Sequence, residues 1–500
     1  MDILILLYII FYTILAKLRL RWAVIFLIVA LPTYLIRFKV LGIPMTILEA
    51  MIFISFFIWF LDNYRIIFNN IKRKLEIRNC LSYCLRQQAR QGKLEVNNRY
   101  PFDLEIILLL IISFIAVAVA GFSDSAFGIW KAYFFEPVLV FVLIINLFGK
   151  QNKGVTTANA FAPLIWPLAI SAFVISVIAI YQKFTGAWIF NDFWAEESTR
   201  RVTSFFGYPN AVGLYLGPII TVLIGWMMYY INSVNKRVIS YRLLVIGSGF
   251  ATVILSMLAI YFAKSMGALI AMVAGLIIFA LLAGRKIKWA TIIILLILGI
   301  GISVYQPARD YAIKTITLKN LSGEIRKQQW RETWAMLKAG RFIAGSGLAN
   351  YQEAIRPYHQ EGIYYNKDND PDFRRKIVIF DEKYKAGRWQ PVEIYLYPHN
   401  IFLNFWTELG LGGLLLFVWL IGRYFVIGIY LIRNWKLEIR NSDMNNNKHL
   451  VLGLICAMIV IIVHGLVDVP YFKNDLAVMF WVLAAMMSIV KLKYQKNETL

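Results

Sequence analysis

The sequence predicts an all-α polytopic membrane protein, and two observations lead to that fold class. The 500-residue chain is 59% hydrophobic and 16% charged, with a mean hydropathy of +0.62. Soluble proteins hold roughly 45–50% apolar and about 25% charged residues. The apolar residues also gather in long runs, and a run of about 18 or more can cross a membrane as a helix. A soluble enzyme is therefore excluded.

Thirteen apolar runs are candidate membrane-spanning helices, and the first two are short. They lie near 2–16, 22–37, 41–61, 103–121, 126–148, 161–181, 207–231, 241–262, 265–283, 288–305, 402–432, 450–467 and 474–490. Because part of residues 1–61 could be re-entrant or interfacial, twelve spans fit equally well. The first run precedes its basic residues, unlike a cleavable signal peptide, so we expect it to be retained. The expected parts are N-terminal transmembrane helices (1–305), an extracytoplasmic loop capping the bundle (306–398) and C-terminal transmembrane helices (399–500).

The net charge of +23 is concentrated in short segments between the apolar runs. Basic loops lie on the cytoplasmic side of membranes, so the strongly basic segment 62–101 is predicted to be cytoplasmic. Alternation then places 182–206 and 306–398 outside, together with Arg37 and Lys39, which break the charge pattern. The charge distribution favours membrane lipids as partners and argues against nucleic acid.

No metal or cofactor is predicted. The three cysteines, Cys80, Cys84 and Cys456, lack the partners of a structural zinc site and indicate free thiols. The acidic run from Asp368 to Asp372 has too few ligands, and no glycine, for a calcium loop. A solvated turn is the expected structure there. Lys131 and Glu136 are ionisable residues within a span, and we expect them to pair with each other or with a neighbouring helix.

The most informative segment runs from Tyr397 to Gly413. His399 falls where the long loop becomes a helix, and a neutral imidazole there can accept a proton near neutral pH. Glu408 lies inside an apolar helix, where an ionisable group is costly. In the alternative, purely structural interpretation, His399 and Asn400 cap the helix and Glu408 pairs with a basic residue. The composite spacing H-N-x2-L-x4-E-x-G-x2-G favours a functional site.

Two further blocks precede this segment in the chain. One is Arg201-Val-Thr-Ser-Phe-Phe-Gly-Tyr-Pro-Asn210, and the other is Ser322-Gly-Glu-Ile-Arg326-x3-Trp330 followed by Gly345-Ser-Gly347. Together with the His399 segment they resemble the O-antigen ligase and polymerase superfamily of membrane glycosyltransferases, over roughly residues 160–470. The sequence departs from that family at Lys264-Ser-Met-Gly267, where members often have Ser-Arg-Gly. It also lacks the usual proline before the G-x-G.

The resemblance implies a GT-C-like fold without a cofactor, and a glycan donor carried on undecaprenyl diphosphate. An acceptor hydroxyl must lose a proton, which suits His399 as general base. The leaving diphosphate needs cationic donors, which suits Arg201 and Arg326. We expect a substrate-binding group of Lys264, Asn210, Asn400 and Glu408, with His464 and Asp468 as supporting residues. Alternatives for these side chains are lipid-phosphate binding by Arg201 and its neighbour Arg200, a solvated Arg326, a snorkelling Lys264, and helix capping by Asn210 and Asn400.

The sequence therefore predicts an O-antigen ligase-like enzyme of surface polysaccharide synthesis in a bacterial inner membrane. Its active site is expected on the periplasmic or extracellular side, and its acceptor is expected to be a glycan of the lipid A–core type. A polymerase that joins lipid-linked repeat units, or an enzyme that glycosylates a protein, would share these motifs. A polysaccharide-lipid transporter or flippase is the alternative from another class. Against it, the candidate charges gather at one face, and no inverted repeat is evident.

Overall fold

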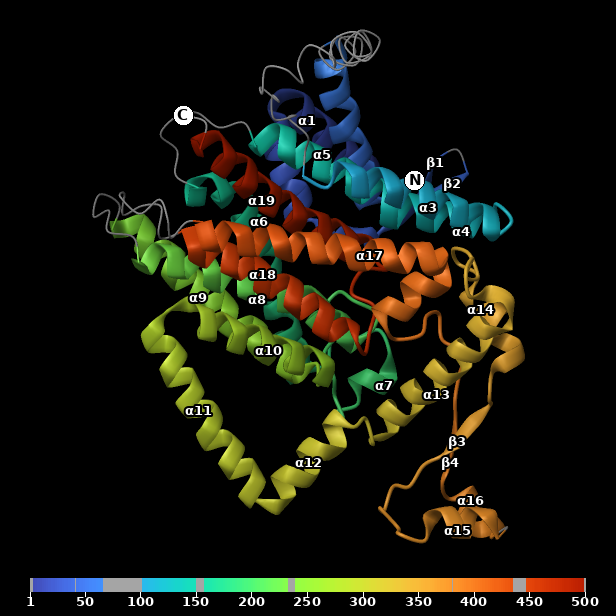
Figure 1. The fold of residues 1–500 in the computed structure, drawn as a ribbon. Helices are drawn as coiled ribbons and strands as arrows, with labels where there is room; N and C mark the ends of the chain where they lie inside the picture. The colour runs from blue at the N-terminus through green and yellow to red at the C-terminus, as the bar shows by residue number, and fades with distance from the viewer. Residues whose placement is uncertain are drawn as a thin grey trace, which may run out of the picture.

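The computed structural model describes residues 3–40, 42–65, 101–149, 157–232, 239–379, 381–434 and 447–498, and these are mostly helical (Figure 1). Eleven helices in this part of the chain are long and apolar enough to cross a membrane. The predicted class, an all-α polytopic membrane protein, is confirmed. Cys80, Cys84 and nearly all of the basic segment 62–101 lie outside the described residues.

The long helices follow the predicted apolar runs closely. They are α1 (Ile3–Val29), an unlabelled helix (Ile47–Arg65), α4 (Asp124–Trp130) continued by η2 (Lys131–Phe135) and α5 (Glu136–Phe148), α6 (Thr157–Thr185), α8 (Pro209–Asn232), α9 (Ile239–Phe262), α10 (Met266–Ala283), α11 (Arg285–Val304), α17 (Ile401–Asn434), α18 (Asn447–Gly465) and α19 (Asn474–Glu498). The predicted run 103–121 is α3 (Asp103–Val119), a 17-residue apolar helix that packs against α17.

Shorter elements connect these helices. Near the N-terminus lie η1 (Leu31–Leu35) and an antiparallel pair, β1 (Arg37–Val40) and β2 (Ile43–Thr46), and α7 (Asp192–Ala195) precedes α8. The segment between α11 and α17 contains α12 (Gln306–Ile316), α13 (Leu321–Met336), η4 (Leu337–Arg341), α14 (Tyr351–Ile355), η5 (Arg356–Tyr358), β3 (Gly362–Tyr364), α15 (Phe373–Val378), α16 (Glu382–Ala386) and β4 (Trp389–Pro391). The β3–β4 ribbon extends away from the helical bundle and carries α15 and α16 at its end (Figure 1).

The first two predicted runs form a helical hairpin. The backbone leaves helical geometry at Arg19 (φ −147°, ψ 66°), and the Tyr12 hydroxyl donates to the carbonyl of Ala23 over 3.1 Å. Eleven residues of straight helix would separate these two by roughly 16 Å, so the chain must reverse at Arg19. The second arm ends at Val29. The predicted run 22–37 was too long, because η1, which contains Pro32, and then β1 follow the helix.

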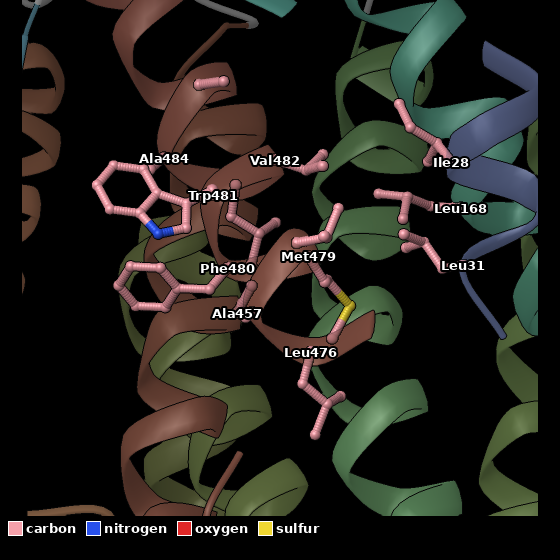
Figure 2. Close-up of a cluster of buried hydrophobic side chains, with 14 of the residues drawn as sticks. Ile28, Leu31, Leu168, Ala457, Leu476, Met479, Phe480, Trp481, Val482 and Ala484 are labelled. Carbon is pink, nitrogen blue, oxygen red and sulfur yellow. The ribbon is translucent and has the colours of Figure 1, made fainter. Parts of the chain in front are cut away.

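The buried centre of the bundle is formed mainly by α8, α18 and α19. Side chains of α19, among them Leu476, Met479 and Trp481, lie in the hydrophobic cluster that Figure 2 shows with Ile28 and Leu168. Where α8 meets α18, glycines allow close contact. A Cβ on Gly225 would lie 2.9 Å from the Cα of Gly453, closer than packed carbons can approach. Small residues at such crossings let helix backbones pack tightly in membranes.

Lys131 and Glu136 pair with neighbouring helices and not with each other. The Lys131 ammonium lies 3.3 Å from the carboxylate of Glu49, and Glu136 accepts a hydrogen bond from Asn474 at the start of α19. Lys131 begins the π-helical turn η2, and Glu136 follows this turn directly as the first residue of α5. Their role is therefore to join α4–η2–α5 to the Ile47–Arg65 helix and to α19.

A break in α17 receives the loop that contains Gly345 and Gly347. Gly410 adopts φ 74° and ψ −177°, a conformation that essentially only glycine tolerates. The break frees the Thr407 carbonyl to accept the Ser346 N–H over 2.6 Å, and the Leu411 N–H donates to Ile343 over 2.9 Å. Gly345 and Gly347 of the long loop and Gly410 of α17 therefore all lie at the backbone contact between this loop and the helix.

We expect Gly410→Ala to destabilise the protein strongly, because the new Cβ would collide with the Ile343 carbonyl in a backbone conformation that itself costs roughly 1–3 kcal/mol. Gly422→Ala in the same helix is the matched control, since a Cβ there meets nothing within 4 Å. The measurement is thermal unfolding in detergent. Equal midpoints for the two variants would contradict the assigned role of Gly410.

Candidate active site

A cavity of about 210 Å³ opens where the segment before α8, the start of α10, the α12–α13 region and the loop after α18 meet. Four of the sequence-predicted site residues line it: Arg201, Asn210, Lys264 and Arg326. His464 and Asp468, which we expected to support the site, line it as well. The other three predicted residues, His399, Asn400 and Glu408, are not in the cavity lining.

Arg201 is held at the cavity wall by three kinds of contact. Its Nε donates to the Ala263 carbonyl over 2.9 Å, its Nη2 donates to Asn210 Oδ1 over 3.2 Å, and its guanidinium lies 4.7 Å from the Trp194 ring centre. Its neighbour Arg200 instead donates to the carbonyls of Lys183 and Ala195. The two arginines therefore differ in role, and only Arg201 faces the cavity.

Lys264 and Arg326 add two further cations to the wall. Lys264 takes a left-handed backbone conformation (φ 51°), and its ammonium donates to the Thr199 carbonyl. Arg326 donates from Nη1 to Ser322 Oγ over 2.6 Å, while its buried Nε has no partner among the described residues. Burial lowers the pKa of Arg326, and burial together with the charge of Arg326 lowers the pKa of Arg201. Two partly buried guanidinium groups and the exposed ammonium of Lys264 line one cavity, and such a set of cations favours binding of an anion with several charges.

A continuous chain of polar contacts links His399 to Arg201. His399 Nδ1 lies 3.9 Å from Asp468 Oδ1, and Asp468 Oδ2 accepts a hydrogen bond from Asn210 Nδ2 over 3.2 Å. Asn210 Oδ1 in turn accepts the bond from Arg201. The Asn210 amide is therefore oriented by a carboxylate on one side and a guanidinium on the other. Asp468 is 1% exposed, so its position is determined by these partners.

One imidazole nitrogen of His399 faces Asp468, and the other lies at the solvent-accessible edge of the ring. Nδ1 is buried on the Asp468 side and is too far for a hydrogen bond, whereas the imidazole as a whole is 18% exposed. Nε2 is thus the nitrogen available to a substrate. Tyr395 and Tyr397 pack edge-on against the imidazole, with ring centres 5.1 and 4.9 Å away. The residue has a left-handed backbone (φ 43°), as suits the turn into α17.

Helix α13 fixes both the cavity and the segment before His399. Gln329 donates to the Tyr397 carbonyl over 2.7 Å, and Trp330 donates to the Pro398 carbonyl over 2.8 Å. Arg326 lies one turn earlier on the same helix. The R-x3-W spacing in the sequence therefore holds a cavity cation and the histidine segment at a fixed relative position.

The ionised state of Asp468 depends on its neighbours. Burial alone would raise the pKa of its carboxyl group, but the His399 and His464 imidazoles and the Val469 amide together lower that pKa well below the usual range. His464 packs against α10, where a Cβ on Gly267 would lie 3.0 Å from its ring. The sequence signal for this pair was the H-x3-D spacing at the end of α18.

Asn400 and Glu408 have positioning contacts. Asn400 Oδ1 caps α17 by accepting the N–H groups of Phe402 and Leu403, and its Nδ2 donates to the Leu466 carbonyl. Glu408 accepts the Ala349 N–H over 2.8 Å. The structural interpretation in which Glu408 pairs with a basic residue was wrong, because this backbone amide is its partner. Substrate binding by either residue remains a sequence-based prediction without support from the cavity.

The acidic run from Asp368 to Asp372 has partners within the β3–β4 ribbon. Asp368 pairs with Arg388, and the Asp370 carboxylate accepts from Lys376 over 2.7 Å and from the Tyr384 hydroxyl over 2.6 Å. These contacts lower the pKa of Asp370 to about 2. The carboxylates hold α15 and α16 together, and the described residues contain no group of three or more metal-ligating side chains.

Comparison with known proteins identifies a family that resembles part of this chain. Residues 251–418 match the family described as O-antigen ligase. The resemblance inferred from the motifs is confirmed. The match includes Lys264, Arg326 and His399, whereas Arg201, Asn210 and Asp468 lie outside it. No curated protein is significantly similar to the chain.

We expect the cavity to bind inorganic pyrophosphate, and Arg326→Met to weaken that binding about tenfold or more. The reason is the loss of charge-assisted hydrogen bonds, each worth about 1.5–3 kcal/mol. Calorimetric titration of the purified protein measures the change. Arg331→Met is the control, because Arg331 is an exposed cation on the same helix. An equal loss in both variants would mean that only the overall charge of α13 matters.

Proposed function

We propose that this protein is a membrane glycosyltransferase of the O-antigen ligase type, which transfers a glycan from undecaprenyl diphosphate to an acceptor hydroxyl. The observation that supports this most directly is the polar chain from His399 through Asp468 and Asn210 to Arg201. It connects an accessible imidazole nitrogen to a cavity with three cations. A base and a leaving-group site held at fixed separation suit displacement of a lipid diphosphate.

The donor diphosphate would occupy the cavity. Arg201, Arg326 and Lys264 would neutralise its charge, which grows as the bond from the anomeric carbon to the diphosphate oxygen breaks and the electron pair stays on that oxygen. Guanidinium groups suit this task because they offer paired donors to phosphate oxygens. The chain's own residues thus supply the positive charge that the transition state requires.

The acceptor would approach the accessible edge of His399. Its hydroxyl oxygen attacks the anomeric carbon, and His399 Nε2 takes its proton, so that no free alkoxide forms. The Asp468 carboxylate, which faces Nδ1, would stabilise the resulting imidazolium and select the tautomer with Nε2 unprotonated. The anomeric carbon gains positive charge as the leaving bond lengthens, and the nearby carboxylate and tyrosine rings suit that charge.

The distribution of basic loops supports a site on the periplasmic or extracellular side of a bacterial inner membrane. There the acceptor would be a surface glycan of the lipid A–core type. A polymerase that extends lipid-linked repeat units is the second candidate. The two reactions differ in product, because a ligase yields one transferred chain and a polymerase yields a ladder of lengths.

Two experiments separate the remaining alternatives. Electrophoresis of the glycan formed from undecaprenyl diphosphate donor and an envelope acceptor fraction distinguishes a single transferred chain from a ladder. Uptake of lipid-linked glycan into vesicles, with and without an uncoupler, tests an ion-coupled transporter. Uptake that collapses with the gradient, without release of lipid diphosphate, would replace the enzymatic proposal.

His399→Ala is expected to lower glycan transfer by about 10²–10⁴-fold, as removal of a general base does. Pyrophosphate affinity should stay within about twofold, because His399 is not in the cavity lining. The measurements are glycan transferred and lipid diphosphate released, with and without EDTA, and transfer by wild type should persist in EDTA. A folded His399→Ala variant with wild-type transfer would exclude His399 as the base.

Asp468→Asn should lower transfer by about tenfold or more, because the imidazolium loses its facing carboxylate. The Asn210 amide also loses its carboxylate partner. Since an asparagine is isosteric, the fold should be retained, as the unfolding midpoint in detergent would check. If Asp468→Asn kept the transfer rate and the pH–rate profile of wild type, Asp468 would have no role in the mechanism.

A further inference from the structure

Lys473 has an unusual environment beside the site. Its ammonium lies 4.8 Å from the ring centre of Phe206 and 5.1 Å from those of Tyr34 and Tyr208. In the described part of the chain no carboxylate lies within 4 Å of it to form an ion pair. Burial lowers the pKa of Lys473, and the charges of Asp475 and Asp468 oppose that effect. Nothing in the reaction proposed above uses this cation.

The three rings come from segments far apart in sequence. Tyr34 belongs to η1, next to the N-terminal hairpin, whereas Phe206 and Tyr208 lie between Arg201 and Asn210. Lys473 itself ends the loop between α18 and α19, where its carbonyl accepts the Ala477 N–H. The ammonium therefore joins the N-terminal region, the Arg201–Asn210 segment and the α18–α19 loop at one point.

Asp468 lies between two anchors of that loop. At one end the Leu466 carbonyl accepts a hydrogen bond from Asn400 Nδ2 over 3.1 Å. At the other end the rings of Tyr34, Phe206 and Tyr208, here called the aromatic box, surround the ammonium of Lys473. The position of this loop determines two contacts of Asp468: the 3.9 Å separation from His399 and the hydrogen bond that Asp468 accepts from Asn210. Because cation–π attraction is strongest when the cation is desolvated, the box is a firm anchor.

We propose that Lys473 is a positioning residue of the transfer reaction: its ammonium, enclosed by Tyr34, Phe206 and Tyr208, fixes the α18–α19 loop so that Asp468 meets His399 and Asn210. This inference rests on the proposed function. It assigns a role in the site to η1, which lies far outside the family-matched residues 251–418. Lys473 acts through Asp468 and does not touch the substrates.

The test compares five variants of the full-length protein in detergent: Lys473→Met, Lys473→Arg, Tyr34→Leu, the double variant Tyr34→Leu/Lys473→Met, and Lys338→Met. Lys338 is the matched control, since its ammonium lies 5.1 Å from the Trp334 ring centre but outside the cavity lining. Transfer kinetics and amide exchange of residues 466–473 are measured.

Lys473→Met should lower kcat about tenfold with both KM values within twofold, and it should speed amide exchange in the loop. Lys473→Arg should restore most of kcat. Tyr34→Leu should lower kcat and speed exchange in the same way, and the double variant should be little worse than Lys473→Met alone. Lys338→Met should match wild type.

Two results would overturn the inference. A higher donor KM with unchanged kcat in Lys473→Met, and no effect of Tyr34→Leu, would make Lys473 a direct substrate ligand. Unchanged loop exchange in both variants would show that the box does not hold the loop. The exchange readout needs no substrate, so it decides the positioning claim even if wild type fails to transfer glycan, which would count against the proposed function alone.

Discussion

A buried carboxylate must be compensated, and the compensation of Asp468 is the constraint on which the site depends. Its two oxygens face different partners: one faces His399 and the other accepts from Asn210, which is bound to Arg201. Removing one of these partners would leave the buried carboxylate less well compensated, at a cost in stability. His399, the proposed base, and the cationic cavity are therefore not independent features. They are two ends of one polar chain whose middle is held by the fold.

The scaffold meets this constraint through close helix packing and a few backbone exceptions. Glycines at the contacts of α8, α10 and α18 bring His464 and the cavity wall together. The break at Gly410 lets the long loop dock on α17, and α13 then holds both Arg326 and the His399 segment. Loop residues thus reach a site that helices alone would not complete. A glycosyl-transfer site of this kind needs rigid positions more than many reactive groups.

Much of the fold could be predicted from the sequence because membrane spans are set by apolar length. The break at Arg19 falls between the two short runs that hydropathy predicted, whereas the β1–β2 pair that follows carries no hydropathy signal. The motif resemblance and the loop charges predicted that Arg201, Asn210, Lys264 and Arg326 share one site, and all four line the cavity. The sequence did not predict that Glu408 accepts a hydrogen bond from a backbone amide, because the donor, Ala349, is 59 residues away. Asp468 was predicted together with His464 as a supporting residue at the outer end of a span. Lys473 carries no local signal, since its aromatic partners come from distant segments.

One helix stands apart from this packing. None of the residues of α11 is buried, and Figure 1 shows it diverging from the bundle before the chain turns back through α12. Thr315 of α12 and the nearby Leu318 line the cavity. Helix α11 packs against α10, so the position of α12, and with it of Thr315 and Leu318 at the cavity, depends on that contact. One wall of the cavity is thereby held in place by the least buried of the eleven candidate spans in the described residues.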